Sequence, residues 1–325
     1  KPEAFVWANV SKDEDKQELT KRYDRLAKSG FTGVFLSGIR DLELEVIAEA
    51  GLKAHIWTWG TNRNDQWIRD NHPDWYMVNR LGESCFDKPP YVGYYRFCSP
   101  VIPGFQRYMQ DLCYKTASHP LVSGVHLDYI RYPDIVLPRA LWSQYGVDQT
   151  EEMPEYDYCY NDHTRKAFME EYGDDPFELK DPAHDQRWLN FRYDSVSKFV
   201  QGIADALDKD LTAAVFPTPR MARKICRQEW ADWPLAAACP MVYHSFYDEP
   251  VEWVGECVLE NIQSTSTPIV AGLYMPAMKT ELEFEMAIRH SLKRGATGIS
   301  LFGGVSDEML AVFEREWQAH LDQSS

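Results

Sequence analysis

One short apolar segment of this chain ends in charged and phenolic side chains, which are the groups best suited to chemistry. It covers residues 124–134 and reads Gly-Val-His-Leu-Asp-Tyr-Ile-Arg-Tyr-Pro-Asp. Because side chains alternate along a strand, His126 and Asp128 share one face while the aliphatic residues between them share the other. The pattern predicts a buried strand that delivers the Asp128 carboxyl at its end. An ion pair of Asp128 with Arg131 that only terminates the strand is the structural alternative.

Short strand-like runs alternate with amphipathic helical stretches along the rest of the chain. This alternation predicts parallel strands joined by crossover helices, and eight repeats close most naturally into an α/β fold, the (β/α)8 TIM barrel. We therefore expect residues 1–325 to form a single barrel domain. The expected strands cover 4–9, 33–37, 53–58, 123–128, 211–216, 237–243, 268–274 and 298–302. The expected helices cover 13–28, 41–50, 103–117, 187–207, 251–263, 281–294 and 307–320.

Two connections are too long to be plain barrel turns. Residues 60–100 follow the third expected strand and residues 132–162 follow the fourth, so both leave the carboxyl ends of strands. Long loops at this end of a barrel build the substrate cleft. Flat aromatic faces suit the apolar faces of sugar rings, although about half of these rings are expected to form the loops' own core. The loop aromatics are Trp67, Trp75, Tyr76, Tyr91, Tyr94, Tyr95, Tyr132, Trp142, Tyr145, Tyr156, Tyr158 and Tyr160.

Polar and aromatic residues also stand where the expected strands end. A barrel without a ligand would fill these positions with Val, Ile and Leu, so their composition indicates a binding cleft. A single histidine such as His55 or His126 can equally be a satisfied core residue. The candidate cleft residues are Asn9, His55, Trp57, Trp59, His126, Asp128, Phe216, Tyr243, His244 and Tyr274.

Charge and cysteine content narrow the classes of partner. The formal net charge of −16 argues against nucleic acid and anionic membrane surfaces and favours a neutral or cationic substrate. No apolar run reaches the roughly 18 residues that span a bilayer. The seven cysteines are scattered without a C-x-x-C pair, so no metal site and no cofactor are expected. Cys85 and Cys98 bracket one loop, and a disulfide between them is left open, as is the oligomeric state.

Several further motifs accompany residues 124–133 in order along most of the chain. They are Val-Trp-Ala-Asn at 6–9, His-Ile-Trp-Thr-Trp at 55–59 with Asn62, His-Pro-Asp-Trp at 72–75, Arg-Gln-Glu-Trp at 227–230 with Trp233, and Pro-Met-Val-Tyr at 240–243. Together they resemble the family 10 glycosylhydrolase-like proteins. The resemblance implies a (β/α)8 barrel, a sugar-polymer substrate, and a bacterial protein exported to the periplasm or cell surface.

Two positions depart from this resemblance. The family often shows a C-x-x-C near Cys159, but the second position here is Asp162, which puts any metal or disulfide role there in doubt. The aspartate that usually precedes Trp230 is Glu229, a carboxylate one methylene longer.

Glycoside hydrolysis ordinarily needs two carboxyl groups, one to protonate the leaving oxygen and one to act as nucleophile or base. We expect Asp128 to be the first and Glu229 the second, with Asp134 and Asp232 as alternatives. Arg131 is expected to lower the pKa of Asp128 and keep it ionised, while burial raises the pKa of Glu229; the opposite assignment of roles stays open. Asn62, Arg131 and Tyr132 complete the expected substrate-binding set.

Two other functions are compatible with the same sequence. In a non-catalytic glycan-binding barrel, the aromatics bind and Asp128 only hydrogen-bonds sugar hydroxyls. A phosphate-ligand barrel would use residues 303–306, Gly-Gly-Val-Ser, after the eighth strand. A Ser306 helix cap followed by Asp307 and Glu308 explains that segment equally well, and those acids would repel phosphate.

Overall fold

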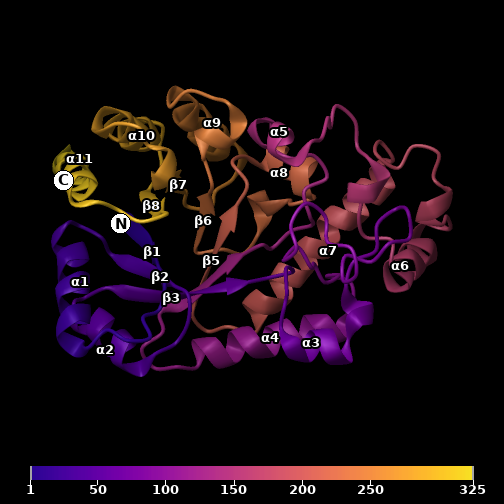
Figure 1. Cartoon of the computed structure of the whole chain (residues 1–325), viewed down its shortest axis with the longest axis horizontal. Coiled ribbons are helices and arrows are strands. Elements are labelled where there is room, and N and C mark those ends of the chain that lie inside the picture. Colours follow the sequence, from indigo (N-terminus) through magenta and orange to yellow (C-terminus); the bar gives the residue numbers. More distant parts are fainter. Residues whose placement is uncertain (1, 324–325) are drawn as a thin grey trace.

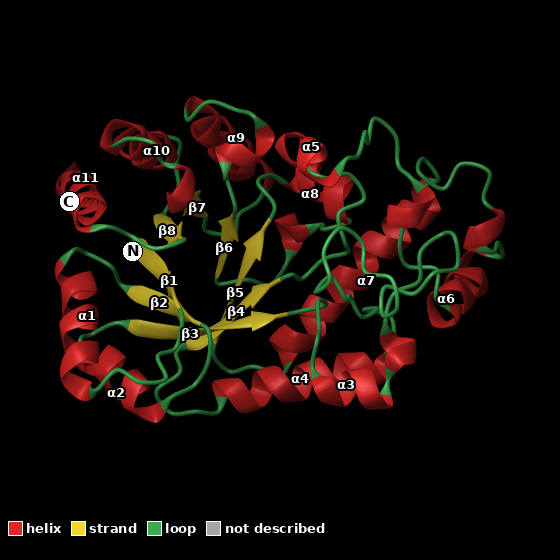
Figure 2. Ribbon diagram, in the orientation of Figure 1, coloured by secondary structure: helices red, strands yellow, loops and turns green. Residues whose placement is uncertain are grey.

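Eight parallel strands form a ring that the chain follows in sequence order (Figures 1 and 2). The computed structural model describes residues 2–323, and hydrogen bonds join its strands in the order β6-β5-β4-β3-β2-β1-β8-β7. Parallel bridges from Ala238 to Ile269 and from Met241 to Gly272 link β6 to β7. The predicted (β/α)8 barrel is therefore confirmed. The strands are β1 (Glu3–Ala8), β2 (Gly33–Leu36), β3 (Lys53–Trp59), β4 (Gly124–Asp128), β5 (Asp210–Val215), β6 (Ala237–Pro240), β7 (Val270–Tyr274) and β8 (Gly298–Phe302).

Helices surround this ring, and Figure 2 shows them in red outside the yellow strands. All seven predicted helices are present: α1 (Lys16–Lys28), α2 (Asp41–Glu49), α4 (Pro103–Ala117), α7 (Gln186–Asp205), α9 (Glu252–Ser264), α10 (Glu281–Lys293) and α11 (Asp307–Gln323). Four other helices were not predicted: α3 (Gln66–Asn71), α5 (Trp142–Tyr145), α6 (Asp162–Tyr172) and α8 (Pro219–Cys226). Three of these, α3, α5 and α6, belong to the segments that follow β3 and β4, so those connections carry structure of their own.

Aromatic rings fill much of the inside of the barrel, together with small side chains and Val270. Phe5 and Phe35 stack with their centroids 4.6 Å apart, and His126 stacks on Phe35 at 3.6 Å. Gly124 makes room for this packing, because a Cβ there would lie 2.5 Å from the Asp210 carbonyl oxygen and 3.0 Å from His55. Rings packed in this way form a solid floor beneath the carboxyl ends of the strands.

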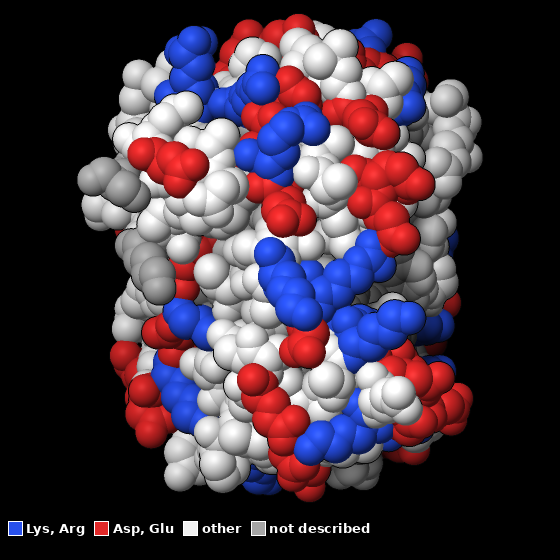
Figure 3. Space-filling model, turned by 90° about the vertical axis from the view of Figure 1, so that its left-hand side faces the viewer, with Lys and Arg blue, Asp and Glu red and all other residues white. Residues whose placement is uncertain are grey.

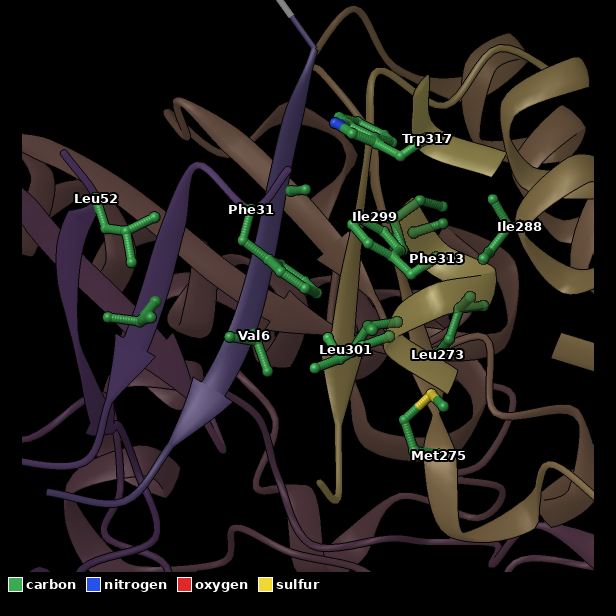
Figure 4. Packing of buried hydrophobic residues seen from close by; sticks show 14 of the residues in the cluster. Val6, Phe31, Leu52, Leu273, Met275, Ile288, Ile299, Leu301, Phe313 and Trp317 are labelled. Carbon is green, nitrogen blue, oxygen red and sulfur yellow. The ribbon is translucent and has the colours of Figure 1, made fainter. Parts of the chain in front are cut away.

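The outward faces of the strands pack against the helices. In Figure 4, Ile299 and Leu301 of β8 lie between β1 and the C-terminal helices. Phe31 stacks on Phe313 of α11 with centroids 4.4 Å apart. Each aliphatic side chain buried in such a layer contributes about 1.5–3 kcal/mol of hydrophobic stabilisation. This layer fixes the strands, and through them the positions of the residues at the strand ends.

One face of the molecule carries charges of both signs, although the chain as a whole has a formal net charge of −16. Figure 3 views the side formed by α1, α10 and α11, where acidic and basic side chains lie interspersed. Ion pairs such as Lys16 with Glu49 and Arg25 with Asp307 account for this mixture. Among residues 2–323, no helix is long and apolar enough to cross a bilayer.

Candidate active site

A cavity of about 380 Å³ is built on the strand ends that carry Asp128. Thirteen of its twenty lining residues are aromatic, and only Asp128, Arg131 and Asp134 carry formal charge. Such a composition suits a ligand with flat apolar faces and a few polar groups. The aromatic residues are Trp7, Trp57, Trp59, Tyr91, Tyr94, Tyr95, Tyr129, Tyr145, Phe216, Tyr243, Phe246, Tyr247 and Phe302.

Asp128 lies at the last position of β4, half-buried against the aromatic wall. Its Oδ2 accepts a hydrogen bond from Trp57 Nε1 at 2.9 Å, and its Oδ1 accepts one from the Tyr129 backbone N–H at 2.8 Å. Burial raises the pKa of Asp128, and this effect outweighs the two hydrogen bonds and the more distant Arg131, which lower it. Arg131 lowers the pKa of Asp128 as expected, but the expected net lowering is wrong, because desolvation dominates and the net shift is upward.

The backbone directly after Asp128 is held in an unusual conformation. Tyr129 has a φ of 49°, in the left-handed region that bulky residues rarely adopt. The Gly60 N–H donates to the Asp128 carbonyl at 2.7 Å, and the Thr61 hydroxyl donates to the Tyr129 carbonyl at 2.7 Å. The first residues of the long connection after β3 thus fix the turn that aims Asp128 and the Tyr129 ring.

Arg131 pairs with Asp134 rather than with Asp128. Its Nη1 donates to Asp134 Oδ1 at 2.9 Å and to the Tyr132 carbonyl at 2.8 Å. Its guanidinium also lies 5.0–5.7 Å from the ring centroids of Tyr95, Phe97, Tyr129 and Phe216. Both partners of this pair are buried and both line the cavity. Asp134 is therefore the second carboxyl group of the cavity wall.

The predicted substrate-binding residues divide into those that line the cavity and those that do not. Trp57, Trp59, Arg131 and Tyr243 line it. Tyr274 stands behind Tyr243, with ring centroids 5.2 Å apart. It supports the wall without lining the cavity.

His55 and His126 lie in the barrel floor below the cavity. Their Nδ1 atoms face the Thr212 hydroxyl at 3.4 Å and 2.8 Å. Burial lowers the pKa of His55 to about 4 and holds that of His126 well below its ordinary value, so both rings are neutral at physiological pH. Both are core residues, as the alternative expected, but neither is fully satisfied, because the Nε2 atom of each ring is buried without a hydrogen-bond partner.

Four other candidates are held elsewhere. Asn9 is exposed beyond the end of β1. Asn62 is buried and accepts the Arg96 backbone N–H at 3.1 Å. Tyr132 is buried with its hydroxyl 2.9 Å from that of Ser195, and His244 contacts Glu283 at 2.9 Å. None of these four lines the cavity.

Glu229, the predicted partner of Asp128, also lies outside the cavity lining. Its carboxylate accepts a hydrogen bond from Arg223 Nη1 at 2.9 Å, and its side chain is 31% exposed. Asp232 is exposed and likewise does not line the cavity. The Trp-rich segment around them instead buries Trp230 and Trp233 against the helices.

Several residues that line the cavity were not predicted, and strand alternation could have identified two of them, Trp7 and Phe302. Trp7 shares the inward face of β1 with Phe5, and Phe302 shares that of β8 with Ser300. Phe246 and Tyr247 follow β6 in a short 3-10 turn that the sequence does not announce.

The loop aromatics divide as expected between cavity and loop core. Tyr91, Tyr94, Tyr95 and Tyr145 line the cavity. The Tyr91 hydroxyl also donates to the Asp134 carbonyl at 2.8 Å, which ties the two long connections together. The buried rings of the loop core are Trp75, Tyr76, Tyr132, Tyr158 and Tyr160.

The remaining motifs have structural explanations. All seven cysteines are free and buried, so Cys85 and Cys98 form no disulfide here. The Ser306 hydroxyl accepts the Met309 backbone N–H at 3.2 Å, which is the helix-capping contact. No group of three or more potential metal ligands occurs within the described part of the chain.

Comparison with known proteins finds solved structures that share this fold. No family model and no curated protein matches the chain. The catalytic domain of a β-amylase from Paenibacillus polymyxa is similar in fold, with 13% identity, a TM-score of 0.66 and 97% of each chain covered. A β-galactosidase from Marinomonas ef1 has 12% identity and a TM-score of 0.65, over 99% of this chain and 60% of that one. A class V chitinase from Pseudomonas fluorescens has 9% identity and a TM-score of 0.53, over 98% of this chain and 100% of that one. The chain thus shares its TIM-barrel fold with glycoside hydrolases.

Proposed function

We propose that this protein is a glycoside hydrolase in which Asp128 is the general acid. The observation that carries the proposal is a carboxyl group with a raised pKa at the end of β4, facing an aromatic-lined cavity. A raised pKa keeps more of the carboxyl protonated near neutral pH, as proton donation requires. The resemblance to family 10 glycosylhydrolase-like proteins and the fold shared with glycoside hydrolases support the same class of reaction.

The proposed chemistry begins with proton transfer from Asp128 to the glycosidic oxygen as the bond to the anomeric carbon breaks. Trp57 Nε1–H and the Tyr129 N–H already point at the two carboxyl oxygens, so they stabilise the carboxylate that forms. Asp134 takes the second role, as nucleophile or as the base that activates water. It replaces Glu229 in this role because it lines the same cavity as Asp128.

Stacking supplies the affinity in this proposal. Sugar rings present apolar C–H faces, and Trp7, Trp57, Trp59 and Tyr243 present ring surface around Asp128. Because Arg131 neutralises Asp134, the cavity wall has no excess of positive charge that would demand an anionic sugar. A neutral or cationic carbohydrate is therefore the proposed substrate, and an exported location stays part of the proposal.

A screen for released reducing ends tests this function. Starch, galactan, chitin, chitosan, cellulose and xylan are each incubated with the wild type and with Asp128→Asn. We expect hydrolysis of at least one polymer by the wild type and none by the variant. Binding of a polymer without turnover by either protein would instead identify a non-catalytic glycan-binding barrel. Neither binding nor turnover on any polymer would contradict the carbohydrate assignment.

A further inference from the structure

A second groove, of about 430 Å³, lies beside the proposed active site. Trp57 and Trp59 line both the groove and the cavity around Asp128. The other walls of the groove are Thr58, residues 62–65, and Leu112 and Thr116 of α4. The end of β3 therefore separates two adjoining spaces, one inside the barrel mouth and one outside it.

Hydrogen bonds make the polar wall of this groove rigid. Arg63 binds both carboxylate oxygens of Asp65 at 2.6 Å and donates to the Trp59 carbonyl at 2.7 Å. Asn64 Nδ2 donates to the carbonyl of Tyr94, a residue of the active-site cavity, at 2.8 Å. The charges of Arg63 and Asp65 cancel, so this wall offers polar groups without net charge. A neutral, hydroxyl-rich ligand matches it.

Next to the groove, Trp67 and Tyr108 stack on each other and form an aromatic platform at the surface. Trp67 of α3 is 51% exposed and lies parallel to Tyr108 of α4, with ring centroids 5.4 Å apart and planes 5° apart. Tyr108, Leu112 and Thr116 are spaced by four residues and therefore share one face of α4. The platform and the groove are thus successive parts of one helix face, and α3 and α4 lie next to each other beside β3 in Figure 1.

We propose that the groove and the Trp67 platform are outer sugar-binding subsites, so that the protein binds a carbohydrate chain of several units rather than a single sugar or a disaccharide. This inference rests on the proposed function and extends it to substrate length. The chain lies across Trp59, its hydroxyls face residues 62–65, and a distal sugar ring stacks on Trp67. Exposed aromatic faces next to a polar rim are the usual partners of such rings.

The dependence of binding on chain length tests the proposal. Dissociation constants are measured by titration calorimetry in the Asp128→Asn background, which prevents turnover. The probes are oligosaccharides of two to six units prepared from the polymer that the screen identifies. We expect affinity to rise between the short and the long members, and Trp67→Ala to reduce that gain about three- to tenfold by removing one stacking contact.

Tyr114→Ala is the matched control, because Tyr114 is also an exposed aromatic of α4, 59% exposed, but is not on the face of Tyr108 and Leu112. The Tyr114→Ala variant should show the same increase in affinity with oligosaccharide length as the Asp128→Asn protein without it. Thr116→Arg, which fills the groove, should reduce the gain as Trp67→Ala does, with melting curves confirming that both variants fold.

The outcomes separate this inference from the proposed function. If affinity does not rise beyond two or three units, or if Trp67→Ala and Tyr114→Ala behave alike, the outer subsites do not exist although the active site stands. If no oligosaccharide binds at all, the proposed function fails, and the inference fails with it.

Discussion

Burial and hydrogen bonding shift the pKa of the Asp128 carboxyl in opposite directions. Burial raises its pKa more than Trp57 and Tyr129 lower it, so the folded protein binds this proton more tightly than the unfolded chain does. Ionising Asp128 therefore costs stability, and its contribution to the free energy of unfolding falls as the pH rises from the ordinary aspartate range to the raised pKa.

This linkage gives a prediction for Asp128→Asn that does not depend on activity. The free energy of unfolding of the wild type minus that of the variant should decrease as the pH rises through this window. Urea denaturation at a series of pH values measures the difference. A difference that grows with pH would show that the native state holds Asp128 as a stabilised carboxylate, which contradicts its role as an acid.

The buried Arg131–Asp134 pair gives a second stability prediction, in which removing one charge leaves the other without a partner. Arg131→Met would leave the Asp134 carboxylate buried without its partner, which should cost about 3–5 kcal/mol of stability. Arg223→Met removes the partner of Glu229 from a pair whose side chains are 37% and 31% exposed, and should cost at most about 1 kcal/mol. Equal losses in urea denaturation of the two variants would refute the buried pair.

Single residues were predictable where strand alternation decides their direction. The position of Asp128 follows from the pattern of residues 124–128, and the floor positions of His55 and His126 were among the stated alternatives. Glu229 was expected beside Asp128 but does not line the cavity, and strand alternation could not have shown this. Its neighbourhood depends on how the segment after α8 folds, which leaves Glu229 outside the cavity lining, and no periodicity in one sequence encodes that arrangement.

At the scale of the elements, the barrel depends on glycine at positions where a neighbouring strand leaves no room for a Cβ. Gly124→Ala would place a methyl group 2.5 Å from the Asp210 carbonyl, inside the register of β4 and β5. We expect a loss of about 1–3 kcal/mol, as for other overpacked cores. Gly93→Ala, where no atom lies within 4 Å of the new Cβ, is the control and should leave the melting temperature near that of the wild type. A neutral effect of Gly124→Ala would contradict this packing.

The elements themselves were predictable to within a few residues. The long helices and the strands show regular periodicity, and glycines just after a helix C-cap mark the helix ends, as Gly30, with a φ of 100°, does after Ser29. The helices α3 and α5 were missed because they have only six and four residues, too few for a periodic pattern to show. The other two carry signals that could have identified them: Gly173 ends α6 in the left-handed region, and the Thr218 cap with Pro219 begins α8.

At the scale of the whole molecule, the fold follows from alternation and the site follows from unequal loop lengths. Within residues 2–323, only the connections after β3 and β4 are long, and they contribute Tyr91, Tyr94, Tyr95 and Tyr145 to the cavity wall. The sequence indicated these loops and their aromatic content. Which rings face the cavity could not be predicted, because packing between two loops distant in sequence decides it.

The most direct test of the central claim compares Asp128→Asn with Glu229→Gln on the polymer that the wild type hydrolyses. Initial rates are measured at one pH, together with melting curves for all three proteins. We predict that Asp128→Asn keeps its fold and loses about 10²–10⁴ in kcat, while Glu229→Gln keeps wild-type turnover. The account is contradicted if Asp128→Asn remains active, or if Glu229→Gln suffers the loss in its place.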